Sequence, residues 1–370
     1  MILTIIASSL FYHYDYWPKW LKIYFGGFIF VGYVSKLIPV FLIVISDLVK
    51  IMRRLFRISQ PKYKDGIKGM TRSEFIKKTG LVLGGVFFGT LTLGMFKWIY
   101  DFKVRKNVVN IPLLPQQFMG FRIVQISDIH LGSWVSKNEL KEAVTIINDL
   151  KADVVFFTGD LVNYSTEEAY PFEQILKSVQ SKYGVYSILG NHDYGDYKRW
   201  SSKEAKARNM EEMFDFYKHL GWKLLLNENQ VIEIEGEEIA IIGVENWGSM
   251  SRFQKYGDIE KAIAGVEDKP VKLLLSHDPS HWELIISKYR TTIDVTFAGH
   301  THGAQFGIEI PGMRWSPAQY IYNYWAGLYS LLNPITNDKQ YLYVNRGIGA
   351  IGYPGRVGIL PEITVVDLHS

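Results

Sequence analysis

The feature that most constrains this chain is a strand-like run that stops at a pair of histidines. Residues 293–297 read Ile-Asp-Val-Thr-Phe, and Gly299-His300-Thr301-His302-Gly303 follows almost at once. β-Branched and aromatic residues favour a strand, and flanking glycines permit a sharp turn and a close approach to the backbone. Neutral imidazole is a common ligand of transition metals. The run therefore predicts a strand that ends at a metal site, although a lone His-x-His is weak evidence.

The same arrangement recurs at four other points in the chain. In each case polar residues of the kind that bind metals follow an apolar strand-like run, and these groups are Asp128-Ile129-His130, Gly159-Asp160, Gly190-Asn191-His192-Asp193 and Ser276-His277-Asp278. Five of the nine histidines lie at these five points. Open α/β sheets gather their ligands at the carboxyl ends of the strands. We therefore expect all five groups to meet in one site.

Apolar periodicity between these points predicts an α/β fold for the second part of the chain. Three strands alternate with three helices at first, and shorter strands follow, some of them in hairpins. The expected strands are 121–127, 153–158, 184–189, 223–226, 231–235, 238–244, 271–275, 293–297, 341–345 and 362–368. The expected helices are 138–150, 167–180 and 203–220.

The candidate ligands form a mixed set of oxygen and nitrogen donors. They are Asp128, His130, Asp160, Asn191, His277, His300 and His302. Such a mixture suits manganese, iron or zinc better than calcium or magnesium, and the absence of cysteine excludes thiolate sites and disulfides. Seven donors are about right for two ions that share a carboxylate, and two ions about 3.5–4 Å apart can clamp a phosphoryl transfer. Taken singly, each aspartate is more often a helix cap or turn former.

The ordered motifs Asp-x-His, Gly-Asp, Gly-Asn-His-Asp, His and Gly-His-x-His resemble those of the calcineurin-like metallophosphoesterases. The resemblance runs from about Phe121 to the C-terminus. The segment Tyr343-Val-Asn-Arg-Gly-Ile-Gly-Ala-Ile-Gly and Pro361-Glu-Ile-Thr are similar to the membrane-associated branch of the family, which includes phosphoesterases that act on UDP-diacylglucosamine. The resemblance implies a layered α/β/β/α sandwich.

The resemblance also implies a role for each residue of the motifs. Asp128, His130 and His302 would hold one metal ion, and Asn191, His277 and His300 would hold the other. Asp160 would bridge the two ions. His192 would stabilise the pentacoordinate phosphorus and protonate the leaving oxygen. Asn163 departs from the pattern, because the family often has an aspartate there, and the change would alter the surroundings of a neighbouring histidine.

The first part of the chain predicts a membrane anchor at 1–103, followed by the phosphoesterase domain at 104–370. Transmembrane segments are expected at about 21–49 and 80–100, since about 20 apolar residues span a bilayer. The first of them is either one long helix or two shorter ones that meet near Lys36 and Pro39. An aromatic cluster between Tyr12 and Trp20 is typical of a membrane–water boundary.

The second apolar segment contains Gly80-x-x-x-Gly84 and Gly85-x-x-x-Gly89, a spacing that lets helices approach closely. These glycines either form a helix contact or reflect the glycine content of membrane spans. Between the two apolar segments lies a basic loop, 50–78, in which ten Lys and Arg against two acidic residues give a net charge of +8. The positive-inside rule keeps this loop in the cytoplasm. We therefore expect a multi-pass protein of the cell membrane with an extracytoplasmic catalytic domain. The alternative is that the basic segment is a helix on the membrane surface and that the domain is cytoplasmic.

Several residues outside the motifs have two interpretations. Arg346 and Arg356 either hold a phosphate over the site or are surface arginines in loops. The aromatic stretch 313–329, which includes Trp315 and Trp325, either contacts a bilayer or an acyl chain or belongs to the core. His281 is interpreted as a surface or packing residue. No role is expected for the remaining histidines, His13, His219 and His369.

Together these features favour a membrane-anchored, dinuclear metal-dependent phosphoesterase that hydrolyses a phosphate ester or pyrophosphate, with a lipid or nucleotide-sugar lipid as a candidate substrate. The expected partners are the lipid bilayer and this substrate. The alternatives are a catalytically silent binding or scaffold protein and a nuclease of the same fold. The domain lacks a basic stripe with interleaved aromatic residues, which a nucleic-acid-binding surface would show. The lack of a His-Glu-x-x-His motif excludes zincin proteases.

Overall fold

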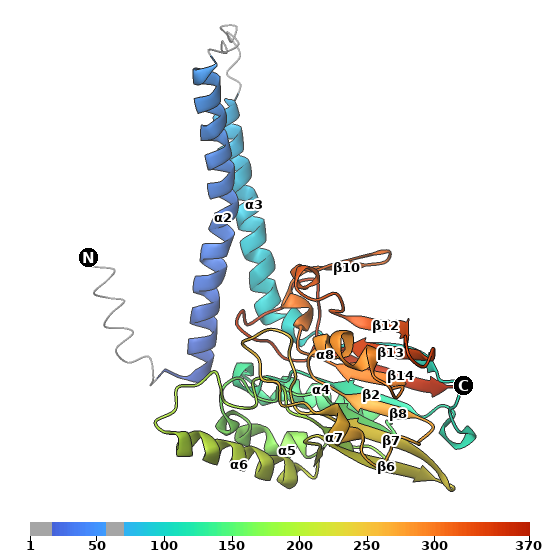
Figure 1. Ribbon diagram of the computed structural model, residues 1–370. Helices are drawn as coiled ribbons and strands as arrows, with labels where there is room; N and C mark the ends of the chain where they lie inside the picture. Colours follow the sequence, from blue (N-terminus) through green and yellow to red (C-terminus); the bar gives the residue numbers. More distant parts are fainter. Residues whose placement is uncertain (1–16, 57–69) are drawn as a thin grey trace. The chain divides into compact units, whose positions relative to one another are not determined.

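The structure is a computed structural model and describes residues 17–56 and 70–370. The described chain divides into two compact units (Figure 1). The described residues up to Lys97, which are 17–56 and 70–97, form a helical unit together with Tyr353–Gly355, and Trp98–Gly352 with Arg356–Ser370 form an α/β unit.

Two long apolar helices, α2 (Lys19–Leu55) and α3 (Arg72–Phe96), build the helical unit. Both are long and apolar enough to cross a bilayer. α2 runs without a break through Pro39, so the described residues contain one helix here and not two shorter ones. A capping box of Thr71 and Glu74 starts α3 inside the segment expected to be a basic loop. Both helices therefore extend farther into that segment than predicted, while 57–69 and the opening run of the chain lie outside the described residues.

One of the two glycine pairs lies at the contact between these helices. A Cβ atom added to Gly80 would come within 3.1 Å of Pro39 Cα, and one added to Gly84 would come within 3.1 Å of Pro39 Cδ. A Cβ atom added to Gly85 or Gly89 would meet no atom within 4 Å outside the helix's own nearby backbone and the adjacent residues. The first pair thus lets α3 approach α2 closely, and the second pair is not part of a helix contact in the described chain.

The α/β unit contains two six-stranded sheets of mixed direction. The first has the strand order β1 (Lys103–Asn110), β14 (Glu362–His369), β2 (Arg122–Ile126), β3 (Val154–Phe157), β4 (Val185–Ser187) and β5 (Lys223–Leu224). The second has the order β12 (Gly327–Leu332), β13 (Lys339–Val344), β9 (Val295–Ala298), β8 (Lys272–Leu275), β7 (Glu237–Gly243) and β6 (Glu228–Ile234). In each sheet three consecutive central strands are parallel, β2–β4 in one and β7–β9 in the other. Their carboxyl ends therefore share one edge of each sheet.

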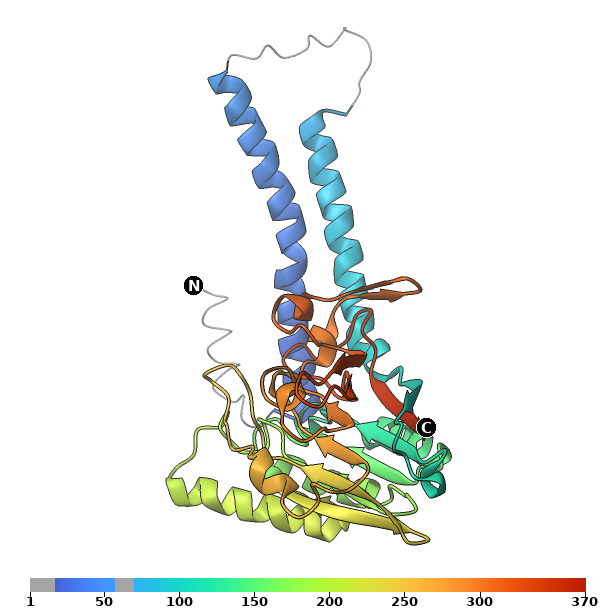
Figure 2. The ribbon, with the colours of Figure 1, turned by 45° about the vertical axis from the view of Figure 1, so that its right-hand side comes forward.

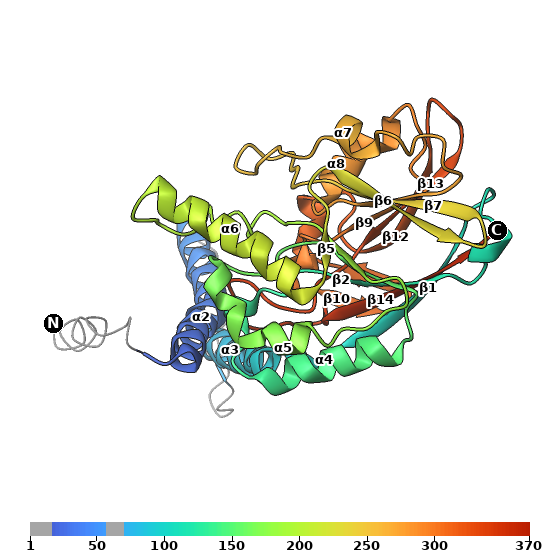
Figure 3. The same cartoon turned by 90° about the horizontal axis from the view of Figure 1, so that it is seen from below.

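The two sheets pack face to face between layers of helices (Figure 3). Apolar side chains of both sheets form one buried cluster, in which Phe156 and Phe297 meet edge to face at 5.0 Å. The outer face of the first sheet is covered by α4 (Lys137–Asp149), α5 (Glu173–Leu176) and α6 (Lys203–Leu220), and that of the second by α7 (Ile259–Ile263) and α8 (Pro279–Leu284). This is the layered α/β/β/α sandwich that the sequence predicts.

Several elements differ from the prediction. The helix expected at 167–180 is a series of short turns and the four-residue α5, and Pro171 prevents one helix from running through the first of these turns. Strands β1 and β12 were not predicted. Nor was the hairpin of β10 (Ile308–Ile310) and β11 (Met313–Trp315), which projects from the α/β unit in both Figure 1 and Figure 2.

Candidate metal centre

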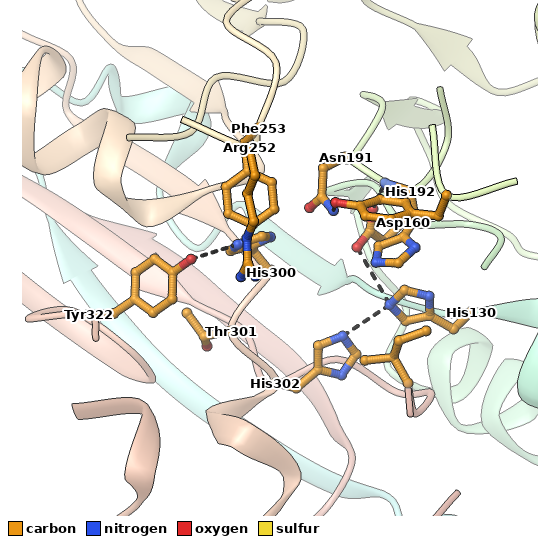
Figure 4. A pocket seen from close by; sticks show the side chains of 12 residues that line it. His130, Asp160, Asn191, His192, Arg252, Phe253, His300, Thr301, His302 and Tyr322 are labelled. Atoms are coloured by element: carbon orange, nitrogen blue, oxygen red, sulfur yellow. Dashed lines mark hydrogen bonds and ion pairs between the residues drawn. The ribbon is translucent and has the colours of Figure 1, made fainter. Parts of the chain in front are cut away.

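The five strand ends meet in one site, as the sequence predicts. Two groups of potential ligands have their donor atoms within 4.8 Å of one another: Asp128, His130 and His302 in one, and Asp160, His277 and His300 in the other. The segments after β2 and β3 of the first sheet and those after β8 and β9 of the second supply these side chains. Figure 4 shows several of them pointing toward a common space.

Asp160 faces histidines of both groups. Its Oδ2 lies 3.5 Å from His130 Nε2 and 3.3 Å from His277 Nε2. Within the first group, His130 Nε2 is 3.0 Å from His302 Nε2, and His302 Nε2 is 3.3 Å from Asp128 Oδ1. Imidazole nitrogens directed at each other and at carboxylates form a set of lone pairs that suits a cation.

Asn191 is an amide and is not counted in either group of carboxylates and imidazoles, but its side-chain oxygen lies at the same space. Its side-chain Oδ1 is buried and has no hydrogen-bond partner, whereas its Nδ2 donates to the Tyr197 hydroxyl at 2.9 Å. A buried carbonyl oxygen without a partner is costly. The amide is thus oriented with its free acceptor available to a ligand, which fits the presence of a metal ion.

The backbone at this site is strained. Five of the seven candidate ligands have a positive φ, namely Asp128, His130, Asp160, His300 and His302, with values from 49° to 71°. Non-glycine residues avoid this region, which costs on the order of 1 kcal/mol or more per residue. Such strain concentrates at functional sites because it aims side chains that an extended backbone would point apart.

Close packing explains two of the glycines in the motifs. A Cβ atom on Gly299 would lie 2.3 Å from Asp128 Oδ2, and one on Gly190 would lie 2.3 Å from Asp160 Oδ1. Any larger residue at either position would displace a carboxylate of the site. The glycines thus let strands of the two sheets bring their ligands together.

Burial and mutual charge set the ionisation of the cluster. Burial opposes the charge of Asp160, yet His277 and His192 outweigh it and hold the pKa of Asp160 well below its usual value. Burial lowers the pKa of His130 to about 3 and also lowers the pKa of His300. For His277, Asp160 outweighs burial and raises the pKa to about 10. At neutral pH the carboxylate of Asp160 is thus ionised and the imidazoles of His130 and His300 are neutral, whereas His277 is protonated, so a metal ion there would replace a proton.

His192 is placed beside the cluster and faces the pocket (Figure 4). Its Nδ1 lies 2.8 Å from the backbone carbonyl oxygen of Asn163, so Nδ1–H donates there and Nε2 is left for other partners. Its backbone N–H donates to Asp160 Oδ1 at 2.8 Å. The main chain of Asn163 thus holds His192, while the Asn163 side chain donates to Ser133.

A cavity of about 290 Å³ lies over the ligands and includes residues that the sequence did not single out. Tyr197, Arg252, Phe253 and Tyr322 are among its lining residues, and Arg252 is the only Lys or Arg among those described there. The Tyr322 hydroxyl lies 2.8 Å from His300 Nε2. The single sequence signal for any of them is the aromatic stretch 313–329, which contains Tyr322.

The structure decides the open interpretations of the two C-terminal arginines. Neither is a surface residue, and neither lines the cavity. Arg346 is buried in an ion pair with Glu362 and donates to Glu309 at 2.7 Å. Arg356 donates to the backbone carbonyls of Arg346, Gly347 and Gly349, so it holds its glycine-rich loop together. The prediction missed this role because the backbone partners become neighbours only in the folded chain.

The other open residues also find their places. His281 is buried, lies 2.8 Å from Ser276 Oγ and stacks on Trp247, so it is a packing residue. Trp325 is buried with Ala318, Ala326 and Ile359, as the core interpretation of the aromatic stretch requires. Trp315 is half-buried on β11.

Comparison with known proteins agrees with this geometry. Residues 121–304 match the family described as calcineurin-like phosphoesterase, and residues 1–98 match the transmembrane domain of probable calcineurin-like phosphoesterases. The chain is 28% identical to the uncharacterized metallophosphoesterase YkuE of Bacillus subtilis over 82% of its length and 99% of that protein.

Two other relatives have names that give a membrane location or a substrate. The transmembrane protein with metallophosphoesterase domain of Danio rerio is 30% identical over 71% of this chain, which spans just 56% of that protein. The UDP-2,3-diacylglucosamine pyrophosphatase LpxG of Chlamydia trachomatis is 26% identical over 70% of this chain and 89% of LpxG. The chain therefore belongs to the calcineurin-like metallophosphoesterases and is a membrane protein that combines a transmembrane domain with a metal-dependent phosphoesterase domain.

Proposed function

We propose that the site holds two divalent metal ions and hydrolyses a phosphate ester or pyrophosphate. Asp128, His130 and His302 would bind one ion, and Asn191, His277 and His300 the other, with Asp160 between them. The observation that carries this proposal is the position of Asp160, whose carboxylate lies within 3.5 Å of histidines from both groups. The free Oδ1 of Asn191 supports the second half of the set.

The donor set favours manganese, iron or zinc, because imidazole nitrogens and carboxylate oxygens together suit borderline divalent ions. Two such ions supply Lewis-acid charge to a phosphoryl group and lower the pKa of water. The chain's own residues bind these ions, and the strained backbone keeps the ligands fixed.

His192 is the proposed proton donor to the leaving oxygen. The carbonyl of Asn163 fixes the ring through Nδ1, so a protonated ring directs its second N–H, at Nε2, away from that carbonyl. The ring also packs against Tyr197, with centroids 4.2 Å apart. A ring held from two sides can give its proton without first reorienting, which favours general acid catalysis.

The proposed substrate is a phosphoester of the membrane, with a lipid or nucleotide-sugar lipid as the first candidate. Two facts support this choice: the transmembrane domain keeps the enzyme at a bilayer, and LpxG is named as a pyrophosphatase of UDP-2,3-diacylglucosamine. Arg252 adds a positive charge to the cavity, which suits a second phosphate or another anionic group of the substrate.

We also propose that the protein crosses the membrane more than once and that its catalytic domain is extracytoplasmic. Arg53 and Arg54 lie in the last turn of α2, and Arg72 begins α3. These basic residues flank the connection between the two apolar helices. The positive-inside rule would keep that connection in the cytoplasm and place the chain after α3 on the other side.

The proposal is tested by assaying the detergent-solubilised full chain with manganese, zinc or magnesium. The substrates are p-nitrophenyl phosphate, its bis-ester, a nucleotide-sugar lipid and single-stranded DNA. We expect manganese- or zinc-dependent turnover of at least one small ester or the lipid, a large loss in Asn191→Ala, and none in Asn138→Ala, an exposed asparagine on α4. Turnover of no substrate would favour a binding protein, and turnover of DNA alone a nuclease. Full activity in Asn191→Ala would reject the site.

A further inference from the structure

The β10–β11 hairpin has two faces of opposite character. Its register pairs Ile308 with Trp315, Glu309 with Arg314, and Ile310 with Met313. Because side chains alternate along a strand, both apolar pairs point to one face and the charged pair points to the other. The strands are closed by Pro311 and Gly312, with φ of 79° at Gly312.

The charged face is turned toward the α/β unit. Glu309 accepts hydrogen bonds from Arg105 on β1 and from Arg346, and Arg346 is itself paired with buried Glu362. Arg314 lies over the ring of Trp325 with its guanidinium carbon 5.0 Å from the centroid. These contacts fix which face of the hairpin points inward.

The apolar face is consequently turned outward. Ile308, Ile310 and Met313 are 43%, 58% and 50% exposed. Two neighbours continue this surface in the segment after β11: Tyr320, whose hydroxyl lies 3.4 Å from Trp315 Nε1, is 76% exposed, and Ile321 is 64% exposed. A hairpin in water usually shows the reverse arrangement, apolar side chains inward and charges outward.

A bilayer is the partner that fits this surface. The patch has about six residues, whereas a stable protein interface takes about 20–30 residues from each side. Trp and Tyr beside aliphatic residues are the side chains that settle at a membrane–water boundary. A membrane is also always within reach, because Lys97 alone separates α3 from the first turn of the α/β unit, Trp98–Tyr100.

We propose that the outer face of the β10–β11 hairpin, with Tyr320 and Ile321, enters the interfacial layer of the bilayer as a second membrane contact of the catalytic domain, independent of the transmembrane helices. This contact would restrain the domain at the lipid surface. The inference uses the membrane location of the chain and does not depend on the reaction that the metal centre catalyses.

The natural absence of cysteine makes a direct test possible. Ile310→Cys and Met313→Cys are labelled singly with an environment-sensitive fluorophore in the full chain, and each variant is reconstituted into nanodiscs with or without nitroxide-labelled phosphatidylcholine. The matched control is Val231→Cys, a 38% exposed strand residue of the β6–β7 hairpin. We expect a blue shift and nitroxide quenching at 310 and 313, and neither at 231.

Three results would overturn the proposal. Emission at 310 and 313 that matches that at 231 would leave the hairpin in water. Quenching equal at all three positions would show that the hairpin contacts lipid no more than an ordinary exposed strand does. A blue shift that depends on protein concentration, without quenching by nitroxide lipid, would assign the face to a second copy of the chain. A phosphoesterase that proved inactive would leave the expected fluorescence unchanged, so the two proposals fail separately.

Discussion

The strand ends around Asp160 and the β10–β11 hairpin depart from ordinary folding preferences in opposite directions. At the strand ends, ionisable side chains are buried, and five of the candidate ligands take a left-handed backbone. On the hairpin, aliphatic side chains are exposed while Glu309 is paired with the buried Arg346. In both places distant segments impose the arrangement against local preference.

The comparison teaches that such conflicts mark where the chain meets something other than itself. A buried cluster of carboxylates and imidazoles is stable when it holds cations, and an exposed apolar hairpin is stable when it meets lipid. Proteins generally break folding rules at functional sites and compensate elsewhere. The compensation here is the well-packed core between the two sheets.

The largest effect is expected from Asp160→Asn, which removes the carboxylate that faces both groups of ligands. Activity should fall at least about 100-fold, since even changes behind metal ligands cost about 10–100-fold, and bound metal should fall with it. Metal analysis and turnover of the purified variant check this. If the variant kept both its activity and its bound metal, the strand ends would be a structural polar cluster. The comparison of the strand ends with the hairpin as two functional contacts would then fail.

His192→Ala should lower kcat by about 10²–10⁴-fold, the usual contribution of general acid–base catalysis. Metal content should stay unchanged, because the Asn163 carbonyl holds the His192 ring, and the backbone N–H that donates to Asp160 is kept in the variant. The control is His219→Ala, an exposed histidine on α6. If bound metal were lost together with activity, His192 would be assigned a role in metal binding and not in proton transfer.

Arg346→Met should destabilise the protein by up to about 3–5 kcal/mol at neutral pH, because buried Glu362 would keep only the more distant and partly exposed Arg105, 3.6 Å away, as a cationic partner. In the native protein, burial opposes the charge of Glu362, yet Arg346 outweighs it and lowers the pKa of Glu362 below 4.5. The stabilisation that ionised Glu362 gives the folded protein is therefore present above pH 4.5 and is lost as the pH falls toward the folded-state pKa of Glu362.

In Arg346→Met, the contribution of Glu362 to the pH dependence of stability should have the opposite sign. The pKa of Glu362 would rise, so the protein would become relatively more stable as the pH falls and the carboxyl takes up a proton. Denaturation curves at several pH values check this, with Lys339→Met, an exposed cation on β13, as the control. A pH profile parallel to that of the native protein would contradict the assignment.

Tyr322→Phe should weaken metal affinity by about 10-fold, the low end for a group that orients a ligand. It removes the hydroxyl 2.8 Å from His300 Nε2 and leaves Asp278 Oδ2 at 3.5 Å from the same nitrogen. Activity measured against metal concentration checks this, beside Tyr256→Phe, an exposed tyrosine of the α/β unit. If the metal dependence of activity did not change, Asp278 and not Tyr322 would be the group that orients His300.

The smallest effect is expected on the hairpin. Ile310→Ser and Met313→Ser should each change the free energy of unfolding in detergent by no more than about 0.5 kcal/mol, as surface substitutions do. Leu273→Ala, between the sheets, should cost about 2–5 kcal/mol in the same assay. Hairpin values as large as that would mean that the apolar face packs against protein.

The sequence could predict the convergence of the strand ends because parallel neighbours put their carboxyl ends at one edge. Polar residues that follow apolar runs are visible without any knowledge of the fold, so the sequence could predict that the seven candidate ligands and His192 lie together. The roles given to them stay predictions until metal is bound. Arg252, Tyr197 and Phe253 gave no such signal, since they lie in loops whose positions only tertiary packing decides.

The hairpin shows a second limit. Its sequence, Ile-Glu-Ile-Pro-Gly-Met-Arg-Trp, alternates apolar and charged residues around a turn, which is a readable hairpin pattern. Alternation alone cannot say which face points inward. The answer comes from Arg105 and Arg346, more than thirty residues away on either side, which bind Glu309. The hairpin was not among the elements predicted from the sequence, and distant ion pairs decide its orientation.

The most direct test of the metal centre is anomalous X-ray diffraction from crystals of the full chain grown with manganese or zinc. The account predicts two anomalous peaks, one beside Asp128, His130 and His302 and the other beside Asn191, His277 and His300, with the Asp160 carboxylate between them. A single peak, or peaks away from Asp160, would contradict it.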